Sequence, residues 1–575
     1  MEKAEKSVET TGYVKGLFEG RVEEEALLPF PEQPAEEREN CDLMLDSVRK
    51  FAESKVDSRA IDEAGAIPEE VKDGLAELGV MGFTIPEEYG GFGMSPIGYC
   101  RLMETITRYD GSVATHIGGH LSLGSKGLVL HGTKEQKERF LPRMATGEWV
   151  GAYALTESGS GSDAGAMKSR AVHDPARDAW VLHGTKIWCT NGGYAHVIQT
   201  FARTEIEVNG KVEDKVTAFV VTRDMPGFSS GKPEYKMGIK GSNTVELAFD
   251  GIAVPGSNVI GTPGKGFRVA LEILDTGRLS LAAGCLGVVR ESMTRALEHA
   301  EQRRQFGKSI VEFEMLKEKF ARMALDAFAL ESMVYLTAGR LARHEDVAVE
   351  AAICKVFGTE AAWRAVNHAV QIAGGSGFMR EYPYERMVRD ARVNMIFEGT
   401  NEILRVFIAL TGMQGPGQAL KALAKGSSAA AIGEFAARKI RRAVSRERIQ
   451  GVPSALGDAA GQVGDAAVEL GKQVEAALVK HGRQILDREY VQERLANAAI
   501  DLYAMSACIA RAASRIARSG ENNPGQDVLL TKTFCEEARR RIRRELRGVG
   551  ENHDASWDEI VSAVRSARDY PNGLY

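Results

Sequence analysis

The hydrophobic pattern of the first part of the chain is helical. Between residues 40 and 147, apolar side chains recur at the spacing of one helix face, as at Leu43, Val48 and Phe51. Residues 67–70, Ile-Pro-Glu-Glu, place a proline in the first turn of a further helix, where its missing N–H is tolerated. We therefore expect a helical domain in this part of the chain.

The pattern changes to that of β-strands between residues 150 and 261. Residues 215–221 are rich in Val, Thr and Phe, and Val245, Leu247 and Phe249 occupy every second position. A period of two places alternate side chains on one face of a sheet. This block therefore predicts a β domain.

Helical patterning returns from residue 266 to about 411, and again from 465 to 518. Residues 412–428 are rich in Gly, Ala, Ser and Pro and predict a linker. The first helical region carries a long apolar stripe, which we interpret as core: Phe313, Leu316, Phe320, Met323, Ala327, Leu330 and Val334. We find no internal repeat, so the whole pattern predicts an α+β protein that is mostly α.

Composition excludes several classes of function. The chain has 575 residues, of which 44% are hydrophobic, and a net charge of only -6, so no basic field favours nucleic acid. Its 7 cysteines are scattered, with no CxxC pair and no histidine at ligand spacing, so we expect free thiols in a reducing compartment and no metal site.

The N-terminus and the apolar runs bear on location. The first ten residues have no apolar core, which predicts no secretory signal. No apolar run reaches the roughly 18 residues of a membrane span. We expect a protein of the bacterial cytoplasm, or a processed organellar form.

The most informative motif is a lone acid after a short apolar run, in residues 395–401, Met-Ile-Phe-Glu-Gly-Thr-Asn. A carboxylate between an apolar stretch and a Gly-Thr corner is partly desolvated, which raises its pKa and makes Glu398 a usable base. Gly399 lets the backbone approach a ligand closely. A buried or helix-capping glutamate is the alternative that the heptapeptide leaves open.

Two other segments are weak signals when each is taken alone. The hydroxyl- and glycine-rich loop at residues 153–164 presents N–H and O–H groups to a polar or phosphorylated ligand, although most such loops are turns. Trp188, within residues 184–193, could cover an aromatic cofactor or could be structural. No GxGxxG motif follows a strand and opens a helix, which disfavours a Rossmann site.

Taken in chain order, these segments resemble the acyl-CoA dehydrogenase family. The resemblance runs through the loop, the Trp188 strand and the Glu398 motif, and continues in residues 237–244, 303–308 and 371–377. It covers essentially the whole chain. It is strongest to the very-long-chain branch, because of residues 318–323 and of residues 498–505 in a C-terminal extension.

The resemblance implies the acyl-CoA dehydrogenase fold: a helical N-terminal domain, a β-barrel-like middle domain and a helical bundle, plus a helical extension. The expected segments are an N-terminal segment (1–39), a helical N-terminal domain (40–149), a β middle domain (150–265), a helical C-terminal catalytic domain (266–411), a linker with a basic amphipathic segment (412–452) and a helical C-terminal extension (453–575).

The resemblance also implies FAD and an acyl-CoA bound between these domains. Glu398 would be the catalytic base, with Ser162, Asp275, Arg278 and Gly399 on the substrate side. The positions that match the family's flavin contacts are Tyr153, Leu155, Thr156, Gly161, Ser162, Trp188, Cys189, Thr190, Arg303, Phe306, Phe313, Gln371, Gly374, Gly375, Thr400 and Asn401. Because Arg303, Phe306, Gln371 and Gly375 would reach the FAD of a neighbouring subunit, the resemblance implies at least a homodimer.

The implied reaction is the α,β-dehydrogenation of an acyl-CoA. Glu398 would remove the α-proton while the β-hydrogen passes as hydride to flavin N5, giving a trans-2-enoyl-CoA. In this family the thioester carbonyl is polarised by the backbone N–H of the glutamate and by a ribityl hydroxyl. The expected electron acceptor is an electron-transfer flavoprotein, and the expected pathway is fatty-acid β-oxidation.

The isovaleryl branch of the family places its base on another helix, immediately before an arginine. Here Gly277 precedes Arg278, so Glu398 is the only base that the pattern offers. Arg278 either shapes the site or forms a salt bridge, and both readings stay open. The chain departs from the family at Cys189, where isoleucine is usual, and at Phe313, near which many relatives offer a glutamine to the flavin.

Two segments bear on chain length and location. The glycines of residues 116–130 include Gly124 and Gly127, and we hypothesise that they deepen an acyl tunnel for long chains, with close helix packing as the alternative. Residues 435–449 form a basic amphipathic pattern, which is typical of peripheral contact with an anionic membrane, with a solvated helix face as the alternative.

Other functions remain as alternatives. An acyl-CoA oxidase shares the fold and the base but gives its electrons to oxygen. A nitroalkane oxidase-like activity is disfavoured, because those relatives use aspartate where this chain has Glu398. An assembly or scaffold protein would keep the fold with incidental catalysis, and Thr156, Trp188 and Arg303 argue against such decay of the site.

Overall fold

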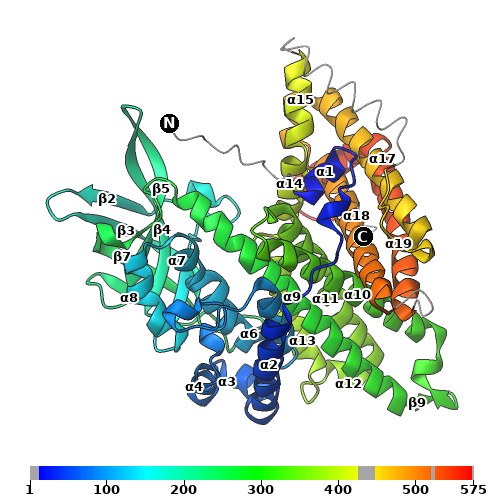
Figure 1. Cartoon of the computed structure of the whole chain (residues 1–575), viewed down its shortest axis with the longest axis horizontal. Coiled ribbons are helices and arrows are strands. Elements are labelled where there is room, and N and C mark those ends of the chain that lie inside the picture. Colours follow the sequence, from blue (N-terminus) through cyan, green and yellow to red (C-terminus); the bar gives the residue numbers. More distant parts are fainter. Residues whose placement is uncertain (1–11, 425–446, 520–524, 573–575) are drawn as a thin grey trace. The chain divides into compact units, whose positions relative to one another are not determined.

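The computed structural model describes residues 12–424, 447–519 and 525–572 of the chain. The chain divides into two compact units, and Figure 1 labels their elements. The larger unit is Pro31–Ile403, and the smaller unit combines Met1–Phe30 with Leu404–Tyr575. The α+β class with mostly helical content, predicted from the sequence, is confirmed.

The first part of the larger unit is helical. Its helices are α2 (Ala35–Lys55), α3 (Ser58–Ala64), α4 (Glu69–Glu77), α5 (Pro96–Thr107), α6 (Gly111–Gly118), α7 (Lys126–His131) and α8 (Lys134–Ala145). The buried face of α2 carries Cys41, Leu45 and Val48. Leu43, which we expected on this face, is 65% exposed. It lies two positions from Cys41 and from Leu45, and two positions along a helix turn a side chain by about 200°.

A sheet follows the helices. Its strands are β1 (Gly151–Ala154), β2 (Arg170–Asp174), β3 (Ala179–Thr190), β4 (Val197–Val208), β5 (Lys211–Thr222), β6 (Phe228–Ser230), β7 (Thr244–Pro255) and β8 (Val259–Ile260). Their order in the sheet is β6-β7-β3-β2-β4-β5-β8, and β1 pairs with β4 in parallel. Four of these strands have 12 residues, so they are longer than the short strands expected from the sequence.

Both faces of the sheet are buried, as β5 illustrates. Val216, Ala218 and Val220 point to a core shared with the helices around the sheet, whereas Phe219 and Val221 point to a second core formed by the strands themselves. Alternate residues of a strand face opposite sides. This explains why residues 215–221 are apolar almost without interruption.

The rest of the larger unit is a second group of helices. It contains α9 (Gly266–Gln302), α10 (Glu314–Ala342), α11 (Ala348–Ala373), α12 (Gly375–Phe378) and α13 (Tyr384–Arg392), with the hairpin β9 (Arg304–Gln305) and β10 (Lys308–Ser309) between α9 and α10. Helix α9 has 37 residues and packs on α5, α10 and α11. Of the predicted stripe in α10, Met323, Leu330 and Val334 are buried.

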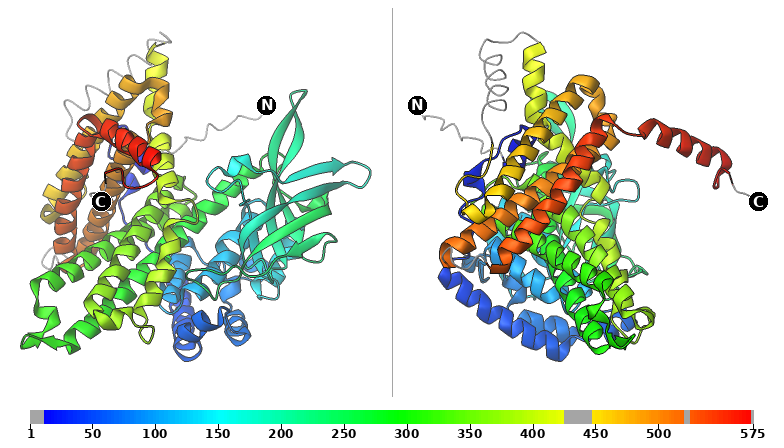
Figure 2. Two further views of the ribbon diagram at one scale, coloured as in Figure 1. Left: turned by 180° about the vertical axis from the view of Figure 1, so that it is seen from behind. Right: turned by 90° about the vertical axis from the view of Figure 1, so that its right-hand side faces the viewer.

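The smaller unit is helical. Its elements are α1 (Tyr13–Phe18), α14 (Asn401–Gly412), α15 (Gln414–Ala424), α17 (Gly457–His481), α18 (Glu489–Ser519), α19 (Gly525–Gly550) and α20 (Asp554–Ala567). Helix α14 begins in the larger unit. The Tyr13 hydroxyl donates to Ser506 Oγ at 2.9 Å, which ties α1 to α18. Helix α20 has no buried residue and projects away from α19 (Figure 2).

Two predictions from the sequence concern this part of the chain. A linker was expected from residue 412, but α15 is a helix up to Ala424, because Ala, Leu and Lys in this stretch outweigh its glycines. Most of the basic amphipathic segment lies outside the described residues. Within the described ranges, no helix is both long enough and apolar enough to cross a membrane.

The glycine-rich segment of residues 118–127 forms a π-helix (Gly119–Gly124) between α6 and α7. A Cβ added to Gly124 would lie 2.4 Å from the Gly151 carbonyl carbon, and one added to Gly127 would lie 2.0 Å from Gln199 Oε1. These two glycines therefore allow close packing on β1 and β4. The hypothesis that they deepen a tunnel is wrong, and the packing alternative holds.

A buried ion pair fixes the loop that follows β1 onto β3. Lys186 Nζ donates to Glu157 Oε1 at 2.8 Å and to the Leu155 carbonyl at 3.0 Å. Glu157 also accepts from the N–H groups of Lys168 and Ser169. Burial alone would raise the pKa of Glu157, but these hydrogen bonds hold it at about 2.

Replacing Glu157 should test this anchor. We expect Glu157→Gln to lower the free energy of unfolding at pH 7 by about 3–5 kcal/mol, because it leaves the Lys186 ammonium buried without a countercharge. The pKa of Glu157 is depressed in the folded state, so the difference from the wild type should narrow as the pH falls from about 4.3 towards 2. Urea unfolding followed by circular dichroism measures both effects.

The exposed Glu205 provides the control, since its side chain is 69% exposed and pairs with Arg170 at 3.5 Å. Glu205→Gln should change the free energy of unfolding by about 1 kcal/mol or less. Equal losses in the two variants would contradict the role given to Glu157.

Candidate active site

Glu398 occupies a corner of the backbone between a 3-10 helix (Val393–Met395) and α14. Its φ is +60°, and that of Gly399 is +93°. A left-handed conformation is unfavourable for a glutamate and persists only where the surroundings hold it. The sequence analysis assigned a role to the backbone at Gly399, where glycine allows close approach to a ligand, but it did not predict the left-handed conformation of Glu398.

Two cations hold this corner. Arg278 Nε donates to the Glu398 carbonyl at 3.3 Å. The buried Lys355 Nζ donates to the Gly399 carbonyl and to Asn401 Oδ1, both at 2.8 Å. The sequence analysis missed Lys355, although one signal was present: it is a single cation in the apolar run of residues 351–358, where a lysine is stable only if it is paired.

The Glu398 carboxylate is held away from water. Its Oε2 atom is buried and has no hydrogen-bond partner among the described residues. Burial raises the pKa of Glu398 to about 7, and the charges of Arg278 and Lys355 oppose this rise. The group can therefore exchange a proton near neutral pH, as a general base must.

Gly277 provides the space for this carboxylate. A Cβ at position 277 would lie 2.8 Å from Glu398 Oε2. Glu398 and the position at which the resemblance places the base of the isovaleryl branch therefore converge on one point, and a side chain at 277 would displace Glu398. Beside them, the Tyr153 hydroxyl donates to the Ala270 carbonyl of α9 at 3.3 Å, which joins β1 to this helix.

Both alternatives for Arg278 hold at once. Its Nη1 donates to Asp275 Oδ1 at 2.9 Å, while its Nε holds the Glu398 carbonyl. Burial raises the pKa of Asp275 to about 6, and Arg278 opposes the rise. Arg278 therefore forms a salt bridge and shapes the backbone at Glu398.

Thr400 and Asn401, predicted to contact a cofactor, make internal contacts. Thr400 Oγ1 accepts from the N–H of Ile403 and so caps α14. The Asn401 amide donates to Thr359 Oγ1 and Glu360 Oε1, both at 3.1 Å. A role of these residues toward a cofactor stays a prediction.

A second cluster lies at the end of β3. The Ile187 N–H donates to the Thr156 carbonyl at 2.9 Å, which places Thr156 beside Trp188. The register of β3 against β7 shifts between Lys186 and Cys189, and Trp188 has a φ of +57°. Its side chain is 62% exposed. Such a bulge aims a side chain outward, and an exposed indole offers a flat face to an aromatic ligand.

The remaining residues of this cluster differ in exposure. Leu155 and Cys189 are buried, Thr190 is half-buried, and Gly161 and Ser162 are exposed. The loop thus presents backbone and hydroxyl groups outward, as predicted. Cys189 faces the interior, so a direct contact of its side chain with a ligand is not supported.

A third set of predicted residues lies elsewhere. Arg303, Phe306, Gln371, Gly374 and Gly375 are exposed. Phe306 is 92% exposed at the tip of the β9–β10 hairpin, and its ring lies 6.2 Å from that of Phe313. The hairpin follows the C-terminal end of α9 (Figure 1), so Arg303 lies roughly 40 Å from Gly277 at the usual helical rise. One chain does not bring this set together with Glu398.

Comparison with known families gives four matches along the chain. They are "Acyl-CoA dehydrogenase, N-terminal domain" at residues 38–148, "middle domain" at 152–252 and "C-terminal domain" at 264–412. The fourth is "ACAD9/ACADV, C-terminal domain" at residues 454–569.

Individual proteins show the same similarity. The chain is 39% identical over 548 residues to the very long-chain specific acyl-CoA dehydrogenase, mitochondrial, of Bos taurus, which covers 93% of this chain and 83% of that protein. An acyl-CoA dehydrogenase from Bacillus anthracis, solved in complex with FAD, superposes with a TM-score of 0.79 at 30% identity, covering 97% of this chain and 96% of that one.

A third similarity is to a chain in a structure of the electron transferring flavoprotein of Acidaminococcus fermentans. It has a TM-score of 0.62 at 34% identity and covers 65% of this chain and 98% of that one.

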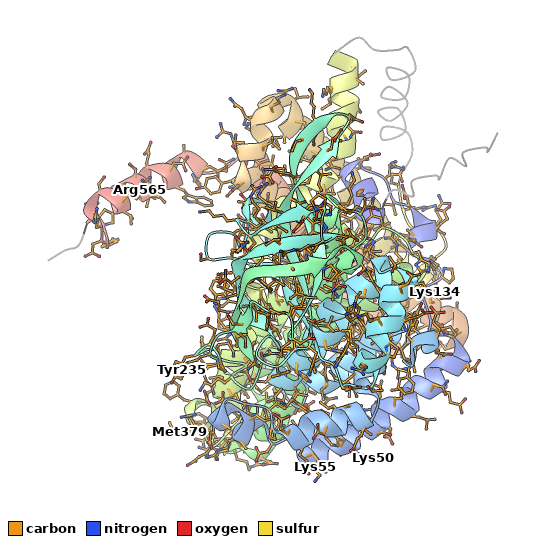
Figure 3. The ribbon with its side chains drawn as sticks, turned by 90° about the vertical axis from the view of Figure 1, so that its left-hand side faces the viewer. Lys50, Lys55, Lys134, Tyr235, Met379 and Arg565 are labelled. Atoms are coloured by element: carbon orange, nitrogen blue, oxygen red, sulfur yellow. The ribbon has the colours of Figure 1, made fainter. Side chains whose placement is uncertain are left out.

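The acidity of Glu398 gives a direct test of the site. Infrared difference spectra between the wild type and Glu398→Gln should show a carboxyl group that titrates near pH 7. In Lys355→Met the same group should titrate at higher pH, because a cation that favours the carboxylate is lost. Lys50→Met, which removes a lysine whose side chain is 76% exposed (Figure 3), should leave the titration unchanged. A Glu398 signal near its ordinary pKa of about 4.3 would contradict the buried site.

Proposed function

The chain belongs to the acyl-CoA dehydrogenase family, and on that premise we propose that Glu398 is the base that removes the α-proton of a fatty acyl-CoA during its α,β-dehydrogenation. The observation that carries the proposal is the buried Oε2 of Glu398, which has no hydrogen-bond partner among the described residues and lies at a point that only glycine at position 277 leaves free. The enzyme class is that of an acyl-CoA dehydrogenase in fatty-acid oxidation; the residue roles below are proposals.

Glu398 combines two functions at one residue. Its carboxylate accepts the α-proton, and its pKa of about 7 makes this transfer efficient near neutral pH. Its backbone N–H donates no hydrogen bond within the described part of the chain. That N–H is available to the thioester carbonyl oxygen, whose charge rises as the α-proton leaves. The left-handed corner keeps both groups in place.

We propose that FAD binds at the cluster formed by Thr156 and Trp188. The exposed Trp188 and the hydroxyl-bearing loop from Tyr153 to Ser162 would hold the flavin, with Thr156 and Thr190 near its ring system. When bound, FAD supplies the acceptor for the hydride that leaves the β-carbon. The protein chain contributes position and exclusion of water.

We propose a homodimer, and the distance between the predicted FAD contacts supports it. Arg303, Phe306 and Gln371 are exposed, and the hairpin lies roughly 40 Å along α9 from the Glu398 site. We propose that these residues complete the FAD site of a second copy. Exposed aromatic and arginine side chains are typical of surfaces that become buried on assembly.

The preferred substrate and electron acceptor are further parts of the proposal. The name of the bovine relative and the match at residues 454–569 support a long or very-long-chain acyl group. The similarity to a chain in the flavoprotein structure supports an electron-transfer flavoprotein as acceptor. We propose that the reaction takes place in the bacterial cytoplasm or, in a eukaryote, on the matrix side of a mitochondrion; the name of the bovine relative supports a mitochondrial location in the second case.

Replacing Glu398 tests the proposed base. Anaerobic mixing of the FAD-loaded protein with acyl-CoAs of increasing length should bleach the flavin, with a rate that rises with pH around a midpoint near 7, because the base must be deprotonated. In Glu398→Gln the rate should fall about 10²–10⁴-fold, while FAD and acyl-CoA still bind.

The exposed Glu402 lies four positions further along and serves as the matched control. Glu402→Gln should bleach at the wild-type rate. Bleaching at the wild-type rate in Glu398→Gln would refute the assignment. Fast reoxidation by air with release of peroxide would favour an oxidase.

A further inference from the structure

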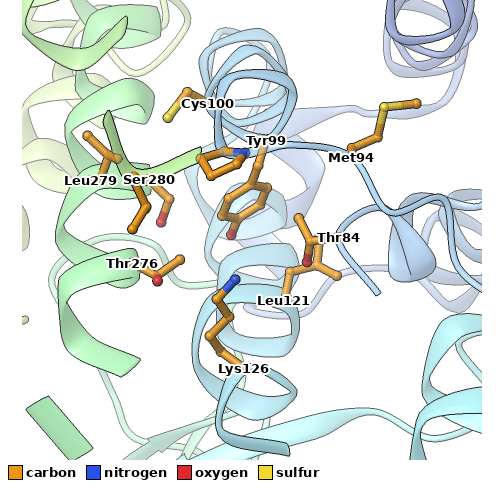
Figure 4. A pocket seen from close by; sticks show the side chains of 11 residues that line it. Thr84, Met94, Tyr99, Cys100, Leu121, Lys126, Thr276, Leu279 and Ser280 are labelled. Carbon is orange, nitrogen blue, oxygen red and sulfur yellow. The ribbon is translucent and has the colours of Figure 1, made fainter. Parts of the chain in front are cut away.

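Lys126, the first residue of α7, points its ammonium group into a cavity (Figure 4). It makes no hydrogen bond and no ion pair with any residue that the structure describes. Burial lowers the pKa of Lys126, and no neighbouring charge opposes this. Lys126 is half-buried, so its ammonium group needs water or a bound polar group from outside the chain to accept its hydrogen bonds.

Tyr99 of α5 faces the same cavity. Its residue is 3% exposed, and its hydroxyl is buried close to those of Ser122 and Ser280, without a hydrogen bond of good geometry among the described residues. Figure 4 shows the Lys126 nitrogen and the Tyr99 hydroxyl directed toward each other. Two donors, an ammonium and a phenol, thus converge on one small space.

The cavity has a volume of about 40 Å³, which is enough for one or two small polar groups. Its wall combines hydroxyl groups of Thr84, Thr276 and Ser280 with the apolar side chains of Leu121 and Leu279. None of the described residues that line it is acidic. The protein therefore supplies no carboxylate to Lys126.

The cavity lies next to the proposed base. Thr276 and Ser280 of α9 line it, and Gly277, between them, faces the Glu398 carboxylate. Burial raises the pKa of Tyr99, the Ser122 and Ser280 hydroxyls oppose this rise, and Glu398 lies close enough to add a smaller increase. The cavity thus begins within one helical turn of the point at which the α-carbon would react.

We propose that Lys126 and Tyr99 bind an oxygen-bearing group on the acyl chain of the substrate, with a carboxylate as the best fit and a hydroxyl as the second. A carboxylate has two oxygens for two donors, and its charge neutralises the ammonium. An unsubstituted alkyl chain offers neither. The inference rests on the proposed function, since it names a substrate class for the same site.

The test compares two series of acyl-CoAs on the FAD-loaded protein, one ending in a methyl group and one ending in a carboxylate, over increasing length. At one length or more, kcat/KM for the carboxylate-ended substrate should exceed or equal that of its methyl-ended partner. Lys126→Met keeps the length of the side chain but not its charge. In this variant the ratio of kcat/KM for the carboxylate-ended substrate to kcat/KM for the methyl-ended substrate of the same acyl length should fall about 10–100-fold. Tyr99→Phe should lower it about 5-fold.

Lys134 provides a matched control, because its side chain is 77% exposed on α8 (Figure 3). Lys134→Met should leave the ratio unchanged. Calorimetric binding of the carboxylate-ended acyl-CoA to the inert Glu398→Gln protein gives a second readout, and adding Lys126→Met should weaken that binding by a similar factor. Hydroxyl-ended acyl-CoAs should give intermediate values.

The two proposals fail in different ways. If methyl-ended acyl-CoAs bleach the flavin, but the ratio and the binding are the same in the wild type and in Lys126→Met at every length, the ammonium is satisfied by water only and the inference is wrong. If no acyl-CoA of either series bleaches the flavin, the proposed function is wrong and the inference falls with it.

Discussion

The backbone corner at Glu398 is the constraint on which the rest of the site depends. A glutamate in left-handed conformation is strained, and here Arg278 and Lys355 hold the carbonyl groups of Glu398 and Gly399. The same two cations limit the rise in pKa that burial causes. Arg278 and Lys355 therefore affect both the position of the carboxylate and its acidity, and the space that the carboxylate occupies exists because residue 277 is glycine.

Buried lysines recur as the means of fixing loops in the larger unit. Lys186 binds the Leu155 carbonyl and the Glu157 carboxylate, and Lys355 binds the Gly399 carbonyl and the Asn401 amide oxygen. In both, an ammonium with three donors holds a loop beside the site by its oxygen atoms. Lys126 differs, because it has no such partners among the described residues and faces a cavity.

The sequence predicted most of the fold, because period and turn residues follow local rules. The sequence also singled out Glu398, Gly277 and Trp188 as residues of the site. All three lie in the larger unit, and Trp188 is exposed. The sequence did not predict Lys355, whose partners come from segments distant in sequence, or Lys126, whose cavity is formed by such segments. The composition of residues 414–424 also led to a wrong prediction of a linker. These residues form a helix, because their helix propensity outweighs the glycines.

The same limit explains the error at Gly124 and Gly127. A glycine in a helix shows that space is needed, but the sequence does not show what fills it; here the backbone of β1 and the Gln199 side chain do. The set around Arg303 and Gln371 shows a further limit, because these residues are exposed in one chain and, in our proposal, belong to a site that a second copy completes. Their role was inferred from the family and not from local physics.

The central claim is that Glu398 takes the α-proton, and isotope exchange measures this step alone. The substrate is an acyl-CoA that carries deuterium on its α-carbon and has no hydrogen on its β-carbon, so hydride transfer is blocked. With the FAD-loaded wild type and with Glu402→Gln, we expect the deuterium to exchange with water, and with Glu398→Gln we expect exchange to be lost. Exchange at the wild-type rate in Glu398→Gln would contradict the account.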